Sequence, residues 1–196
     1  MAQYGSQVEA RWHPDFVKAG VLYPPTQLVL VGLKKEKQLQ VYAASDGQSP
    51  HFIRSFPILA ASGKMGPKLR EGDLQVPEGI YRIESLNPNS AFHLALRVSY
   101  PSAQDRAQAN HEGRTDLGSD IMIHGSNASV GCLAMGDEAA EDLFVLTAQT
   151  GLEHTSVLLC PLDFRTSLLP QDAKRPTWVQ DRYSQLEIAL KKLPRP

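Results

Sequence analysis

Alternating apolar and polar residues predict that strands dominate the middle of the chain. The segments TQLVLVGL (26–33) and KQLQVYAA (37–44) flank a short charged turn, and Leu39, Val41 and Ala43 alternate with more polar neighbours. This pattern predicts a β-hairpin. The turn between the two segments, KKEK, contains its own acid, and we expect it to be solvated.

Further strands are predicted along the rest of this region. HFIRSFPILAAS is interrupted by Pro57, so we expect an edge strand or two short strands. In AFHLALRVSYP, four apolar residues alternate with more polar ones, which predicts a half-buried strand. These four residues are Phe92, Leu94, Leu96 and Val98. The remaining predicted strands are GIYRIESL (79–86), DIMIH (120–124) and HTSVLLC (154–160).

Two helices are predicted from periodic apolar positions. We expect Asp137 to cap the first helix and Gly151 to end it, with a stripe of Ala139, Leu143 and Leu146 between them. The second begins near Pro176. Its apolar residues are spaced four and three apart: Val179, Tyr183, Leu186, Leu190 and Leu193. We expect this amphipathic helix to dock on the β-rich region, and partner binding or self-association is the alternative.

Two regions show no clear period. Residues 1–23 are expected to be a partly ordered lead-in that packs on the main domain, and residues 102–119 a long polar loop of the kind that is often functional. The predicted organisation is therefore this lead-in, a central domain over 24–165 and a helical extension over 166–196. The predicted fold class is mainly β with one inserted helix, plus the C-terminal amphipathic helix.

Composition excludes several classes of function. The chain has 196 residues and a formal net charge of −1, which predicts no attraction to nucleic acid or to anionic lipid. Its two cysteines fit neither a disulfide-rich scaffold nor a zinc ribbon, and its six histidines show no metal-binding spacing. We therefore expect no metal, no cofactor and a monomeric protein.

The sequence gives no direct signal of location. No run approaches 18 consecutive apolar residues, and Met1–Pro24 lacks the basic start, apolar run and cleavage site of a signal peptide. Two interpretations are open. The protein stays in the cytoplasm, or it is exported and its leader is not part of this sequence.

The segment IMIHGSNASVGCLAM (121–135) has the parts of a nucleophilic site. A cysteine attacks as the thiolate, and a nearby imidazole can accept its proton, so His124 and Cys132 form a candidate pair. Gly131 permits unusual dihedral angles, and its amide and that of Cys132 could face an oxyanion. The alternative is a small buried cysteine and an ordinary hydrogen-bonded histidine. Cys160, at a strand end, is expected to be buried and inert.

Three segments together resemble the L,D-transpeptidase (YkuD-like) catalytic domain family. IMIHGSNASVGCLAM follows its His-Gly … Ser-x-Gly-Cys pattern, GPKLREGDLQVPEGIYRI resembles its turn-and-strand segment, and NPNSAFHLALRVSYPSAQDRA resembles the stretch before the signature. They occur in the family's order and cover roughly residues 26–165. The resemblance is greatest to the YafK-type branch, and it implies an L,D-transpeptidase-like β-sandwich or barrel.

The resemblance implies roles for individual residues. Cys132 matches the nucleophile, His124 the general base, and the carbonyl of Gly125 would orient the imidazole. Ser129 and Gly131 match the small residues beside the site. This chain departs from many members in having Val130 where they carry a second histidine, Ala134 where they carry an arginine, and a shorter His-to-Cys spacing. The resemblance implies that the missing groups would help to bind substrate carboxylates or to polarise the acyl group.

Upstream residues are candidates to replace the missing groups. Tyr100, Asp105 and Arg106 are expected to contact substrate, and Arg106 could pair with a carboxylate of a peptide stem. The charges of the REGD turn (70–73) are further candidates, with side chain–backbone bonding in the loop as the alternative.

The implied activity is acyl transfer through a Cys132 thioester on peptidoglycan stem peptides. An amine acceptor gives a transpeptidase, and water gives a hydrolase that trims stems or releases a wall-attached protein. A non-catalytic wall-binding module is a third possibility. The implied partners are peptidoglycan stems and a wall-attached protein, and the implied location is the periplasm or cell envelope.

Overall fold

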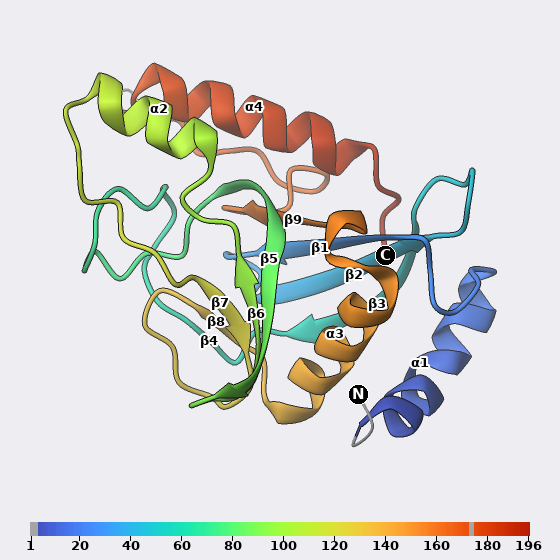
Figure 1. The fold of residues 1–196 in the computed structure, drawn as a ribbon. Coiled ribbons are helices and arrows are strands. Elements are labelled where there is room, and N and C mark those ends of the chain that lie inside the picture. The colour runs from blue at the N-terminus through green and yellow to red at the C-terminus, as the bar shows by residue number, and fades with distance from the viewer. Residues whose placement is uncertain (1–3, 173–174) are drawn as a thin grey trace.

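A single curled sheet of nine strands forms the centre of the molecule, with helices on both of its faces (Figure 1). The computed structural model describes residues 4–172 and 175–196. The strands are β1 (Gln27–Leu33), β2 (Gln38–Ala44), β3 (His51–Pro57), β4 (Ala60–Ala61), β5 (Gly79–Ser90), β6 (His93–Val98), β7 (Met122–His124), β8 (Leu133–Ala134) and β9 (Thr155–Cys160). The helices are α1 (Gly5–Ala19), α2 (Ala103–His111), α3 (Asp137–Thr150), the 3₁₀ helix η1 (Leu152–His154) and α4 (Thr177–Lys191).

The sheet has the order β3-β2-β1-β9-β5-β6-β7-β8-β4. The predicted hairpin is confirmed, since β1 and β2 pair antiparallel from Gln27↔Ala44 to Leu33↔Gln38. The 12-residue β5 joins the two halves of the sheet. Its first residues pair with β9 and its later residues pair with β6, with a register shift between Ile83 and Ser85.

The two edges of the sheet meet. Strands β3 and β4 lie at opposite ends of the strand order, yet only Ile58 and Leu59 separate them along the chain. Three Cα steps span at most about 11 Å, so the sheet must curl until its edges are neighbours. The amides of these two residues complete the contact by donating to the carbonyls of Lys37 and Ala134. This nearly closed, mainly β fold confirms the predicted class, and Pro57 separates two short strands as expected.

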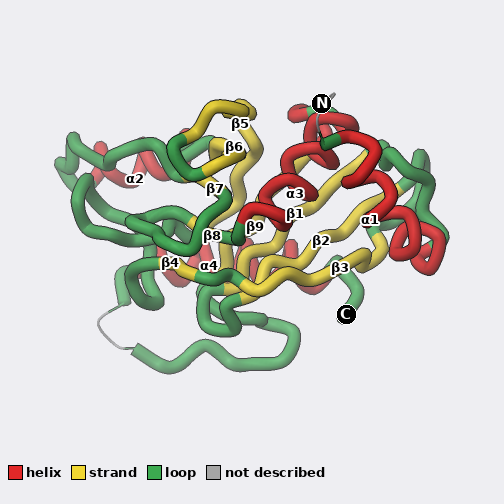
Figure 2. The backbone as a smooth tube through the Cα atoms, turned by 90° about the horizontal axis from the view of Figure 1, so that it is seen from below, coloured by secondary structure: helices red, strands yellow, loops and turns green. Residues whose placement is uncertain are grey.

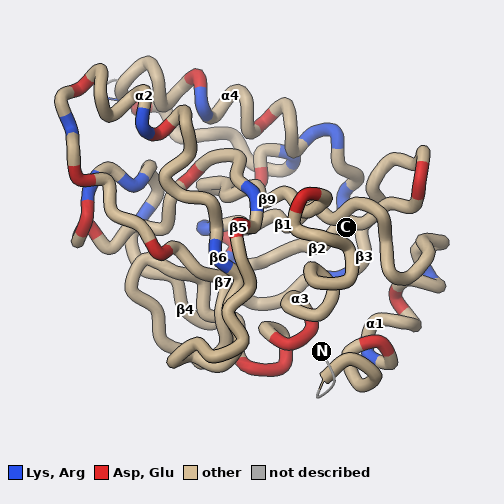
Figure 3. Tube along the Cα trace, in the orientation of Figure 1, with Lys and Arg blue, Asp and Glu red and all other residues tan. Residues whose placement is uncertain are grey.

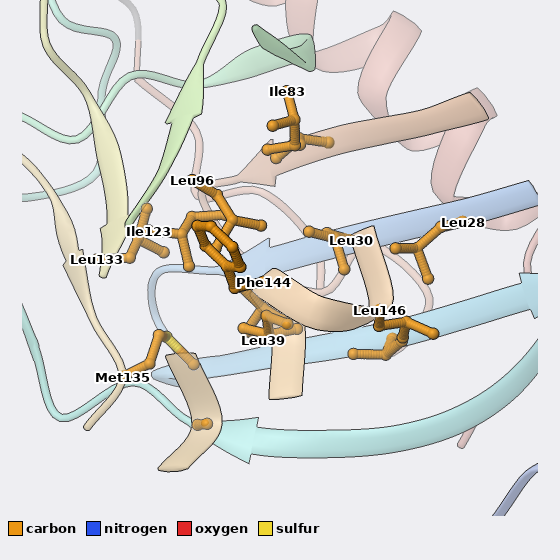
Figure 4. Close-up of a cluster of buried hydrophobic side chains, with 14 of the residues drawn as sticks. Leu28, Leu30, Leu39, Ile83, Leu96, Ile123, Leu133, Met135, Phe144 and Leu146 are labelled. Carbon is orange, nitrogen blue, oxygen red and sulfur yellow. The ribbon is translucent and has the colours of Figure 1, made fainter. Parts of the chain in front are cut away.

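Both faces of the sheet are covered. Side chains of β1 alternate between the faces, and six of its seven residues are buried. Figure 4 shows the larger cluster, which packs between the sheet and α3 and includes Leu28, Leu30, Leu96, Phe144 and Leu146. The second cluster lies between the other face and α4, and it contains Val31, Leu33, Cys160, Tyr183 and Leu186.

The C-terminal helix docks as predicted. All five residues of its apolar stripe are buried. Helix α4 also runs beside α2 (Figure 1), where Arg182 lies 2.7 Å from Asp105 and the Trp178 indole donates to Glu112 at 2.6 Å. Residues 173–174 of the predicted extension lie outside the described residues.

The lead-in packs on the main domain as expected, but it does so as a regular helix that the sequence did not predict. Residues Gly5–Ala19 form α1, whose Val8, Trp12 and Phe16 are buried at four-residue intervals in the larger core cluster. The sequence signals for this helix are weak because Pro14 lies inside it and no side chain caps its start. Residues 1–3 of the lead-in lie outside the described residues.

The polar segment 102–119 is not one long loop. It begins with α2. A reciprocal capping box between Ser102 and Asp105 stabilises the start of this helix. The helix buries only Asp105 and Ala109, so it shows no apolar stripe in the sequence. Its stability therefore depends on the cap and on its contacts with α4.

Two smaller expectations also need correction. Asp137 does not cap α3, because the N-cap is Gly136 and the Asp137 carboxylate accepts the Ser126 amide at 2.7 Å instead. Lys34 is not solvated, because its side chain is 8% exposed and lies 2.9 Å from the buried Glu78 carboxylate. A charged side chain this deeply placed needs such a partner.

Candidate active site

Pairing between β7 and β8 places His124 and Cys132 on one face of the sheet. The strands are parallel, with Ile123 opposite Leu133 and His124 opposite Ala134. One step back along this register, Cys132 lies beside Met122, whose side chain shares a face with His124. The Met122 amide donates to the Cys132 sulfur at 3.3 Å. Strand β8 lies between β7 and β4, near the meeting edges of the sheet (Figure 2).

The imidazole of His124 is fixed in one orientation. The side chain is 2% exposed, and Nδ1 lies 2.6 Å from the carbonyl oxygen of Gly125. A carbonyl only accepts, so Nδ1 carries the proton and Nε2 keeps its lone pair. Burial lowers the pKa of His124, against the opposing effect of the Gly125 carbonyl, so the ring is neutral at neutral pH. The Phe92 ring covers the imidazole at a centroid distance of 4.9 Å.

The turn after His124 has no room for a side chain. A Cβ on Gly125 would lie 2.5 Å from the Asp137 carboxylate and 2.8 Å from the carbonyl oxygen of Phe92. Asp137, at the start of α3, holds the next residue by accepting the Ser126 amide. The chain therefore turns tightly between the helix start and the β5–β6 hairpin, which keeps the Gly125 carbonyl in reach of the imidazole.

The Cys132 thiol is partly exposed and protonated. Its sulfur accepts the Met122 amide and lies 3.5 Å from the carbonyl oxygen of Asp120, to which the thiol donates. Burial raises the pKa of Cys132, and the Met122 hydrogen bond only partly opposes this. Within the described part of the chain, these backbone groups are the hydrogen-bond partners of the sulfur. The site therefore holds a neutral thiol and a neutral imidazole rather than a preformed ion pair.

The amides of Gly131 and Cys132, which were expected to face an oxyanion, donate hydrogen bonds to two side-chain hydroxyls. The Gly131 amide donates to Ser62 Oγ at 2.6 Å, and the Cys132 amide donates to Ser129 Oγ at 3.0 Å. Ser129 Oγ in turn donates to the Cys132 carbonyl at 2.5 Å. Gly131 adopts a φ of +83°, which suits glycine. In this structure both amides are therefore engaged by side-chain hydroxyls.

The predicted substrate-contacting residues are not brought together. Tyr100 is buried and donates to the carbonyl of Leu117 at 3.1 Å. Asp105 is buried in the α2 cap and paired with Arg182, while Arg106 is exposed on α2. Internal bonds thus occupy Tyr100 and Asp105, and Arg106 alone of the three has an exposed side chain.

The aspartate of the REGD turn, Asp73, stabilises its loop, which was the alternative to a role in substrate binding. The carboxylate of Asp73 accepts the Lys68 ammonium at 2.7 Å and the backbone amides of Leu69, Arg70 and Gln75. This arrangement holds the loop before β5 in shape.

Several residues near the site carried no local signal. Ser62 reaches the Gly131 amide only because β4 pairs with β8, a strand more than 70 residues later in the chain. Phe92 was expected on the buried face of a strand, and this was wrong. Strand β6 begins at His93, and Phe92 lies in the preceding turn, 47% exposed and against His124.

The fold and the site define a class of protein: a curled, β-rich domain with a histidine at the end of one short strand, a cysteine just before the neighbouring strand, and a helix after it. The sequence model of the L,D-transpeptidase catalytic domain family matches residues 26–157, and the chain belongs to this family. The resemblance inferred from the three sequence segments is confirmed.

Individual relatives agree with this assignment. The chain is 35% identical over 113 residues to the Escherichia coli K12 protein named "Putative L,D-transpeptidase YafK", a match that covers 57% of this chain and 43% of YafK. Among solved structures, the helical cell shape determining protein Pgp2 from Campylobacter jejuni superposes with a TM-score of 0.56 at 24% identity, over 69% of this chain and 48% of Pgp2. Bdellovibrio bacteriovorus Bd1075 superposes with a TM-score of 0.50 at 20% identity, over 84% and 56% of the two chains.

The similarity covers only part of each relative. The chain spans less than half the length of YafK, and the structural matches show the shared fold. Among the described residues, none of the helices has the length and apolar character needed to cross a membrane. The boundaries of the central domain at 24 and 165 stay a prediction.

Proposed function

We propose that this domain transfers acyl groups of peptidoglycan stem peptides through a thioester on Cys132. The observation that supports this most is the state of His124: its Nδ1 proton is bonded to Gly125, and its Nε2 lone pair is on the sheet face that Cys132 shares. An oriented neutral imidazole on the same face of the sheet as a thiol fits what general-base catalysis requires.

In the proposed reaction, the Cys132 thiol leaves the Asp120 carbonyl and gives its proton to Nε2 of His124 as sulfur attacks the peptide carbonyl. The S–C bond forms, and the carbonyl oxygen takes negative charge. The amides of Gly131 and Cys132 stabilise it after Ser62 and Ser129 turn away. The C–N bond then breaks, and the imidazolium returns the proton to the leaving amine. Proton transfer accompanies attack because the raised pKa of the thiol and the lowered pKa of the imidazole disfavour a resting ion pair.

We infer that an L-configured residue followed by a D-residue supplies the acyl group, as in the family. An amine of a second stem resolves the thioester in a transpeptidase, and water resolves it in a hydrolase. Arg106, exposed on α2, stays a candidate for binding a stem carboxylate, whereas internal contacts occupy Tyr100 and Asp105. Such a substrate places the protein in the periplasm or cell envelope.

The thioester proposal is tested by intact-mass spectrometry after incubation with a carbapenem, a β-lactam that acylates reactive cysteines of this family. We expect one adduct on the wild-type chain and on the matched control Cys160→Ala, and none on Cys132→Ala. An adduct on Cys160, or no adduct on any variant, would contradict the proposal.

The acceptor is identified with isolated stem tetrapeptides. New cross-linked dimers indicate a transpeptidase, and a shortened stem without dimers indicates a hydrolase. A chain that binds the peptide but forms neither a product nor a thioester is a wall-binding module.

A further inference from the structure

A cavity of about 260 Å³ lies between the β1–β2 turn and the segment that succeeds β4. Four of its nine lining residues are lysines, and no aspartate or glutamate is among them. These lysines are Lys34, Lys35, Lys37 and Lys64. Over the whole chain, basic and acidic residues are nearly balanced and interspersed (Figure 3). The cavity is therefore a local concentration of positive charge in a nearly neutral protein.

One of the four lysines is already neutralised. Lys34 is held by the Glu78 carboxylate at 2.9 Å and by the carbonyls of Gly66 and Val76. Lys35, Lys37 and Lys64 are exposed, and within the described ranges none of them forms an ion pair. Three cations around one cavity, without a protein carboxylate facing them, leave room for a negatively charged ligand.

The cavity adjoins the candidate nucleophile. Its wall includes Ser62, whose hydroxyl accepts the Gly131 amide at 2.6 Å, one residue before Cys132. The register of β4 and β8 agrees, since Ala61 pairs with Leu133 and the next step places Ser62 beside Cys132. A peptide bound with its reacting carbonyl at the sulfur could thus extend a neighbouring residue into the cavity.

We propose that this lysine cavity binds a carboxylate of a stem peptide adjacent to the reacting bond. The inference rests on the proposed acyl-transfer function and adds the group that the site recognises. The volume equals that of roughly eight or nine liquid water molecules, which admits a small residue with its carboxylate rather than a whole stem. Two sources share this chemistry: the C-terminal carboxylate of the leaving D-residue, and the C-terminal carboxylate of an acceptor stem.

Binding is measured without chemistry in the full-length Cys132→Ala chain. Isothermal titration compares a stem tetrapeptide that has a free C-terminal carboxylate with the same peptide as its C-terminal amide. We expect the free acid to bind about 3- to 10-fold more tightly, the range for two partly exposed charge pairs. Adding Lys35→Gln and Lys64→Gln should remove this preference, and so should high salt.

The matched control is Lys18→Gln together with Lys192→Gln, which removes two lysines at the ends of α1 and α4, outside the cavity. This control should keep the preference for the free acid. Equal affinity for acid and amide, or a preference that survives loss of Lys35 and Lys64, would overturn the proposal.

Rapid-mixing mass spectrometry of chains that retain Cys132 separates the two sources. If the leaving residue occupies the cavity, the lysine variant forms the thioester more slowly at low donor concentration. If the acceptor occupies it, thioester formation is unchanged and only resolution by a carboxylate-bearing amine slows. Normal thioester formation without any acid preference rejects the cavity and keeps the proposed function. An acid preference without a thioester in the wild type rejects the function.

Discussion

Cys132 and Cys160 each lie at or next to the end of a strand, but Cys132 is partly exposed and Cys160 is buried. Cys160 ends β9 and Cys132 directly precedes β8, and burial raises the pKa of both thiols. Cys160 is fully buried in the cluster between the sheet and α4. Cys132 is partly exposed, bonded to the Met122 amide and the Asp120 carbonyl, and on the face of His124.

The comparison shows what the fold contributes to reactivity. A depressed thiol pKa does not distinguish Cys132, because both thiols are protonated at neutral pH. What distinguishes it is access to solvent and an oriented imidazole on the neighbouring strand. The same residue type beneath α4 has neither, so its role is packing.

The largest expected difference is in alkylation of the native protein. Iodoacetamide should label Cys132 at least about 10³-fold faster than Cys160, because labelling of Cys160 requires unfolding that costs about 5–15 kcal/mol. The Cys132 rate should be slower at pH 7 than that of an unstructured peptide thiol and should rise with pH, since the reactive thiolate forms only as the pH approaches the raised pKa. Peptide mapping by mass spectrometry measures both rates.

Denatured protein is the control, in which both cysteines should label at similar rates. Comparable labelling of the two thiols in the native state would remove the contrast on which the proposed site depends.

Replacing His124 should slow the reaction of Cys132 and leave Cys160 unaffected. His124→Ala should slow carbapenem acylation of Cys132 by about 10²–10⁴-fold, the usual contribution of a general base, and leave the protection of Cys160 unchanged. Raising the pH should recover part of the loss, because hydroxide then generates the thiolate. Acylation rates from intact-mass time courses between pH 6 and 10 test this.

His124→Gln keeps most of the buried volume without a base and should show the same loss. His154→Ala, at an exposed histidine of η1, should react as the wild type does. Near-wild-type acylation in His124→Gln would exclude His124 as the base.

Loosening the core around Cys160 should affect that cysteine alone. Leu186 on α4 is fully buried in the same cluster, and Leu186→Ala should cost about 2–5 kcal/mol of unfolding free energy. Cys160 labelling should accelerate, while the acylation rate of Cys132 stays within about twofold of wild type. Urea unfolding and thiol labelling give the two measurements.

Ile188→Ala, on the exposed side of the same helix, is the matched control and should change stability little. A large drop in Cys132 acylation in Leu186→Ala would show that α4 supports the site as well as the core.

The strands could be predicted because alternation is a local property. The hairpin of β1 and β2, the break at Pro57 and the stripe of α4 are all readable from neighbouring residues. Helices α1 and α2 could not be read in this way, because one contains Pro14 and the other has almost no apolar residues. Their stability comes from contacts with α3 and α4, which no short window of sequence contains.

The candidate site shows the same division. The His124–Cys132 pair and the Gly125 turn lie within one segment, so their types and spacing were visible. Contacts between segments that are distant in the sequence were not visible. Examples are the contact of Ser62 with Gly131 and the lysine cavity beside it. Asp105 illustrates the opposite error: a charge that suggested substrate contact is used by the α2 cap and by Arg182.

The smallest expected effect concerns the cover of the base. Phe92 is 47% exposed and packs on the His124 ring, so Phe92→Ala should admit water to the imidazole with little change in stability. Burial lowers the pKa of His124, so hydration raises it toward the ordinary value. Because the neutral ring is the active form, the acid limb of the acylation profile should move to higher pH. Acylation should fall by a factor of about two to five near pH 6 and match the wild type at pH 8. Phe92→Leu keeps an apolar cover and should shift the limb less, while Cys160 labelling stays constant in both variants. An acid limb that does not move would show that Phe92, in the β5–β6 turn, contributes nothing to the burial of His124. The sheet alone would then account for the buried imidazole that Cys132 has nearby and Cys160 lacks.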